Sequence, residues 1–66
     1  MITEQEIMNN ALKDLLFYEE NMAKKYANIS EQITDPKIQK MLQGLEQSAR
    51  NHYRILTQTM SKFSIV

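Results

Sequence analysis

Glu19 and His52 are the two residues of this chain whose types and positions could together form a chemical site. His52 is the single histidine of the 66-residue sequence, and Glu19 is a charged residue within an otherwise apolar helical pattern. A carboxylate and an imidazole that lie together in a protein interior form either a hydrogen-bonded pair or two ligands of a metal ion. Whether they meet depends on the elements that hold them.

The sequence around Glu19 predicts a long amphipathic helix. Its residues recur in alternating steps of four and three, which is typical of one packed helical face. The members of this pattern are Met8, Leu12, Leu15, Glu19, Met22, Tyr26, Ile29 and Ile33. Thr3 and Glu6 have the spacing of a capping box, in which each side chain satisfies a backbone N–H group of the first turn. We therefore expect a helix from about residue 4 to about residue 33.

A turn at about residues 34–35 separates this helix from a second one at about residues 36–62. Pro36 suits a first helical position and keeps Asp35 out of helical geometry, so Asp35 or Thr34 is the predicted N-cap. The second helix repeats the alternating pattern with Ile38, Leu42, Leu45, Ala49, His52, Leu56, Thr59 and Phe63. Residues Ser64 to Val66 are expected to fray. So short a turn makes the helices antiparallel neighbours, and the predicted fold class is an all-α, two-helix hairpin.

The hairpin register predicts that Glu19 faces His52. Glu19 lies about 15 residues before the turn, and the segment from Ala49 to His52 lies about 14 to 18 residues after it, which places them at one level. Both belong to the packed faces, so we expect the pair to lie inside a helical bundle.

The size of the chain predicts self-association. A single domain of residues 1–66 buries little apolar surface, and without cysteine it has no disulfide to compensate. Two hairpins related by a two-fold axis would form a four-helix bundle. An axis near the level of Glu19 and His52 would assemble two carboxylates and two imidazoles, a set compatible with zinc or iron. The other interpretation, which we favour, is that the pair forms a buried polar layer, which fixes the register of the helices without a metal.

Several functional classes are disfavoured. Eight basic and eight acidic residues cancel, so the chain lacks the basic surface that binds nucleic acid or an anionic membrane. The first ten residues, MITEQEIMNN, do not read as a secretion signal, and no apolar stretch approaches the ~20 residues of a membrane span. We therefore expect a cytoplasmic protein. The sequence shows neither a nucleophile–histidine–carboxylate arrangement nor a glycine-rich phosphate loop, so an enzyme is not expected.

Residues of about 10 to 62 resemble the spore coat protein F family of spore-forming bacteria, within the ferritin-like superfamily. The resemblance lies in Asp14-Leu15-Leu16, Glu19, Met22, Tyr26, the turn Asp35-Pro36-Lys37-Ile38 and an ending near Met60. It implies a half-length relative whose dimer rebuilds a ferritin-like four-helix bundle. It also implies a structural or interaction role in the spore coat or sporulating cell, with coat-like or other helical proteins as further partners.

The same resemblance bears on metal chemistry. Ferritin-like di-iron proteins carry a glutamate on the first helix and Glu-x-x-His on the second, so Glu19 and His52 would be the matching ligands. Ala49 stands where the bridging glutamate is expected, and Glu46 lies one turn further away. Oxygen-activating di-iron chemistry is therefore not expected. The two readings carried forward are a non-enzymatic structural homodimer and, as the alternative, a metal-binding or vestigial di-iron protein. A third reading is an adaptor that binds another helix through exposed Met and Tyr side chains.

Overall fold

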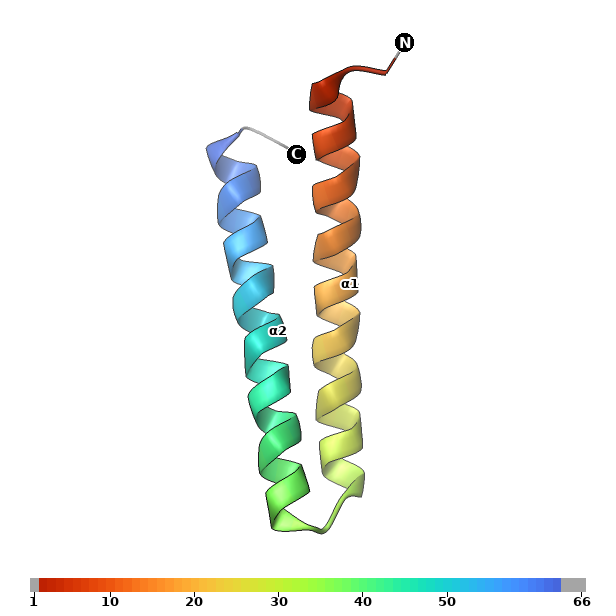
Figure 1. The fold of residues 1–66 in the computed structure, drawn as a ribbon, viewed down its shortest axis with the longest axis vertical. Coiled ribbons are helices and arrows are strands. Elements are labelled where there is room, and N and C mark those ends of the chain that lie inside the picture. Colours follow the sequence, from red (N-terminus) through yellow and green to blue (C-terminus); the bar gives the residue numbers. More distant parts are fainter. Residues whose placement is uncertain (1, 64–66) are drawn as a thin grey trace.

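The computed structural model describes residues 2–63, which form two α-helices joined by a short turn. Helix α1 spans Glu4–Gln32 and helix α2 spans Pro36–Lys62. The helices run antiparallel and side by side, so that the start of α1 and the end of α2 lie at the end away from the turn (Figure 1). The predicted all-α helical hairpin is confirmed. Helix α1 ends one residue before the expected position, and the predicted fraying of Ser64 to Val66 lies outside the described residues.

Thr3 caps the start of α1. Its hydroxyl oxygen accepts a hydrogen bond from the backbone N–H of Glu6 at 3.1 Å, and its hydroxyl group donates to Oε1 of Glu6 at 3.2 Å. In the predicted capping box the Glu6 carboxylate would accept from the backbone N–H of Thr3 instead. The predicted hydrogen bond from the backbone N–H of Glu6 to the Thr3 side chain is therefore confirmed. The Glu6 carboxylate, in contrast, accepts from the Thr3 hydroxyl group and not from the Thr3 backbone.

Asp35 is the N-cap of α2, one of the two caps that the sequence predicts. Its Oδ1 atom accepts hydrogen bonds from the backbone N–H groups of Lys37 at 2.8 Å and Ile38 at 3.1 Å. Pro36 occupies the first helical position, where its missing N–H group costs nothing. Two of the backbone donors that a helix start leaves unpaired are thus satisfied by one side chain.

Gln39 ties the start of α2 to the end of α1, which the sequence pattern did not predict. Its Nε2 atom donates to the backbone oxygen of Ser30 at 3.2 Å and to that of Ile33 at 3.0 Å. The last turn of α1 contains no basic residue that could bind these carbonyl groups. A side chain of the neighbouring helix therefore acts as the C-terminal cap of α1.

The helices contact each other along what we call the inter-helix seam, formed by the less exposed side chains of both. On α1 the seam contains Leu12, Leu16, Glu19, Ala23, Tyr26 and Ser30, and on α2 it contains Gln39, Leu42, Glu46, Ala49, Tyr53, Leu56 and Met60. The members alternate steps of four and three, as expected for two helices packed along their length. The buried residues of the described chain, Ala23, Ser30, Leu42 and Ala49, all belong to it.

Within one hairpin, only part of each predicted packing face lies in the seam. Leu12, Leu42 and Leu56 lie in the seam as expected, but Leu15 and Leu45 are 49% and 41% exposed. The apolar stripe on each helix is wider than one neighbouring helix can cover. Residues one position before the seam are rotated by about 100° around the helix axis, which turns them away from the partner helix.

Candidate functional site

The structure brings Glu19 and His52 together across the two helices. The Nδ1 atom of His52 lies 3.3 Å from Oε2 of Glu19, although 33 residues separate them in the sequence. When Nδ1 carries the hydrogen, the imidazole donates to the carboxylate, and Nε2 of a neutral ring is then an acceptor or a metal ligand. The pair is the contact that the hairpin register predicts.

The two partners differ in burial. The Glu19 side chain is 18% exposed, because Glu19 lies in the inter-helix seam, whereas the His52 side chain is 58% exposed. His52 directly precedes the seam residue Tyr53, so the helix turns its ring toward one side of the hairpin. The expectation that both residues are enclosed is therefore not met within one chain, since a single hairpin covers the carboxylate and leaves the imidazole open.

One chain contributes two donor groups to any metal site at this position. Within residues 2–63, no cluster of three or more His, Cys, Asp or Glu side chains has the geometry to hold an ion. Glu46 binds the Arg50 side chain at 2.8 Å, and Ala49 is buried and has no donor atom. Zinc sites in proteins have four ligands, or three and a water. A second chain would have to supply the remaining donors.

Apolar side chains surround the pair on the side to which His52 points. A shallow groove between the helices is lined by Tyr18, Met22 and Leu45 together with Glu19 and His52. A second groove, further from the turn, adds Leu15, Ile55 and Leu56 around the same pair. The surroundings of the pair are thus suited to packing against another apolar surface.

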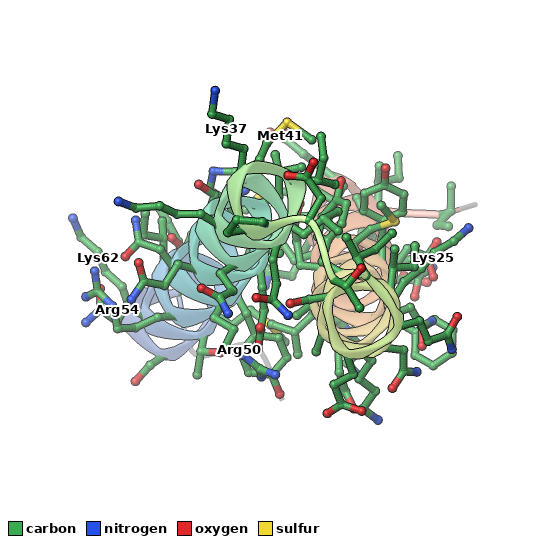
Figure 2. The ribbon with its side chains drawn as sticks, turned by 90° about the horizontal axis from the view of Figure 1, so that it is seen from below. Lys25, Lys37, Met41, Arg50, Arg54 and Lys62 are labelled. Carbon is green, nitrogen blue, oxygen red and sulfur yellow. The ribbon has the colours of Figure 1, made fainter. Side chains whose placement is uncertain are left out.

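These grooves belong to a larger exposed surface that we call the apolar face. It consists of Leu15, Tyr18 and Ile29 on α1 and Ile38, Met41, Leu45 and Ile55 on α2, which are 36% to 57% exposed. Each of these residues directly precedes a seam residue. Because the helices are antiparallel, this shift turns both sets toward the same side of the hairpin. In Figure 2, viewed along the hairpin, Met41 projects to one side of the two helices and Arg50 to the other.

The opposite side, which we call the charged face, has its own polar partners. Glu20 and Lys24 pair at 3.0 Å on α1, and Glu46 and Arg50 pair at 2.8 Å on α2. Both pairs have the i, i+4 spacing that stabilises a solvated helix by about 0.2–0.5 kcal/mol. A groove on this side is lined by Glu20, Lys24 and Arg50, in contrast to the apolar lining around His52. The hairpin is therefore amphipathic as a whole.

Comparisons with known protein families, curated proteins and solved structures gave no match to this chain. The resemblance to the spore coat protein F family thus stays a prediction. Neither of the two described helices has a segment of the length and apolarity needed to cross a membrane.

Proposed function

We propose that this chain is a non-enzymatic structural or interaction protein that works as a homodimer, with two hairpins forming a ferritin-like four-helix bundle. The observation that supports this most is how little one hairpin buries. Among the described residues, the buried side chains are three small or medium apolar ones, Ala23, Leu42 and Ala49, and the polar Ser30. A single hydrophobic core in a chain of this size rarely supplies more than about 3–5 kcal/mol of stability, and pairing with a second copy is one way to add to it.

A structural role accounts for the Glu19–His52 pair without further chemistry. In the bundle the pair forms a polar layer between apolar side chains, and such layers set the register of packed helices. The resemblance of residues of about 10 to 62 to the spore coat protein F family supports a place in the cytoplasm or the spore coat of a spore-forming bacterium. The partners would be a second copy first and other coat-like or helical proteins second, without nucleic acid or membrane.

Metal binding is the second candidate function. Its support is the 3.3 Å separation of His52 Nδ1 and Glu19 Oε2, which places a nitrogen and an oxygen donor side by side. Two chains would bring two such pairs to one level, and this donor set suits zinc or iron. Ala49 cannot supply the bridging carboxylate of a di-iron centre, so the metal would serve a structural or vestigial role.

Light scattering combined with elemental analysis tests both candidates on untagged protein purified without a chelator. A dimer without metal is the expected result for the structural role. About half an equivalent of zinc or iron per chain, lost in a His52→Ala variant, would support the metal-binding function instead. A chain that stays monomeric at concentrations of tens of micromolar would contradict the homodimer.

A further inference from the structure

We propose that the apolar face is the surface through which the two copies of this chain pair, so that the charged faces form the outside of the dimer. This inference rests on the proposed homodimer and adds the surface that the partner covers. The seam residues are already in contact with the other helix. The apolar face is the side of the hairpin on which large apolar side chains gather while their own chain leaves them uncovered.

The area left exposed by the hairpin matches the area that a dimer interface needs. A compact monomer of this 7.8 kDa mass exposes about 4,400 Å2. The chain exposes 5277 Å2, an excess of about 900 Å2 that reflects its elongated shape. A standard protein–protein interface buries about 800 Å2 on each partner. The excess exposed by the hairpin as a whole is therefore about the area that one interface with a second copy would cover.

The distribution of charge makes the apolar face a better dimer interface than the charged face. Pairing through the charged face would remove water from the Glu20–Lys24 and Glu46–Arg50 pairs, and desolvation of ion pairs opposes burial. The apolar face carries no ion pair apart from the His52 contact with Glu19. Covering its large apolar side chains removes them from water, which favours association.

His52 lies on the side of the hairpin that carries the apolar face, so a dimer formed through this face would contain the Glu19–His52 pair in its interface. The His52 ring is 58% exposed in the hairpin, and the grooves beside it are lined by Leu15, Leu45 and Ile55. A second copy on this face would enclose the ring between apolar residues toward the turn and apolar residues toward the chain ends. The pair would then be buried, as a register-setting polar layer requires.

Matched charge insertions on the two sides of α2 test the inference. Leu45→Glu places a carboxylate on the apolar face, whereas Gln47→Glu places the same group on the other side of the same helix, where Gln47 lines a groove with Gln43 and Arg50. Light scattering at matched concentrations should show a dimer for the wild type and for Gln47→Glu. The dimer dissociation constant of Leu45→Glu should rise at least tenfold. A Leu45→Glu dimer as tight as the wild type would overturn the inference, while a monomeric wild type would contradict the homodimer itself.

Spin labels decide the case in which Leu45→Glu fails to fold. The chain has no cysteine, so Ser48→Cys and Gln47→Cys each introduce a single attachment point. Ser48 lines the groove beside His52 on the apolar face, whereas Gln47 lines the groove of Gln43 and Arg50 toward the charged face; the two positions meet at a third groove on the outer surface of α2. Double electron–electron resonance on the labelled dimers measures the distance between the two labels, one on each copy. This distance should be shorter for labels at position 48 than for labels at position 47. The reverse order would show that the copies pair through the charged face.

Discussion

The imidazole of His52 contacts the carboxylate of Glu19 at 3.3 Å, and the two groups lie on different surfaces of the hairpin. The carboxylate belongs to the seam between α1 and α2, while the imidazole lies on the apolar face. A change at this pair should therefore affect both the packing of the hairpin and the proposed pairing with a second copy.

Replacing Glu19 alone should destabilise the protein more than replacing the whole pair. In the proposed dimer, Glu19→Ala leaves His52 buried without its partner, which costs about 1–3 kcal/mol for an unsatisfied polar group. The double variant Glu19→Leu with His52→Leu should be as stable as the wild type or more so, because an apolar layer replaces the polar one. Urea titration at fixed protein concentration measures both free energies of unfolding.

The double variant also separates the two interpretations of the pair. If it unfolds at lower urea than Glu19→Ala, the pair contributes more than register, and a bound metal becomes the better explanation. His52→Gln serves as the control, since glutamine keeps a hydrogen-bonding side chain but is a poor metal ligand.

Gln39→Leu should lower the free energy of unfolding by about 1 kcal/mol. The reason is that Nε2 of Gln39 donates to the backbone oxygens of Ser30 and Ile33 and so caps α1. Gln43→Leu, one turn later on the exposed surface of α2, is the matched control and should have little effect. Thermal unfolding followed by circular dichroism compares the two, and equal melting temperatures would show that water replaces the cap without loss.

Gly44→Ala should stabilise the protein by about 0.5–1 kcal/mol. Gly44 lies in the middle of α2, and a Cβ atom placed there meets nothing within 4 Å. Alanine then gains the difference in helix propensity without a steric cost. A rise in melting temperature is expected, whereas a fall would mean that a partner packs closely against this position.

Ala49→Leu should destabilise the hairpin by about 1–3 kcal/mol, because Ala49 is only 4% exposed and the larger side chain would push the helices apart. Gln58→Leu adds the same side chain at an exposed position of α2 and is the control. Guanidinium titration measures the free energy of unfolding of both variants. An unchanged midpoint for Ala49→Leu would mean that the seam has room for three additional carbon atoms.

The elements and their ends could be predicted because local chemistry determines them. The Asp35 side chain starts α2 by accepting hydrogen bonds from the backbone N–H groups of Lys37 and Ile38, and the Thr3 hydroxyl starts α1 by accepting one from Glu6. The pairing of Glu19 with His52 could also be predicted, since a short turn fixes the register of two antiparallel helices. The cap that Gln39 provides could not, because it joins residues of two helices and has no characteristic spacing.

The sequence by itself determined two amphipathic helices, their turn, their antiparallel order and the level at which Glu19 meets His52. Only the tertiary structure decided which part of each wide apolar stripe forms the seam and which part is left for the apolar face. The physical reason is that periodicity marks every apolar position of a helix alike, whereas the rotation of each helix depends on which side chains fit between them. The seam combines the small side chains of Ala23 and Ala49 with larger ones such as Leu42, whereas Leu15, Met41 and Leu45 lie outside it.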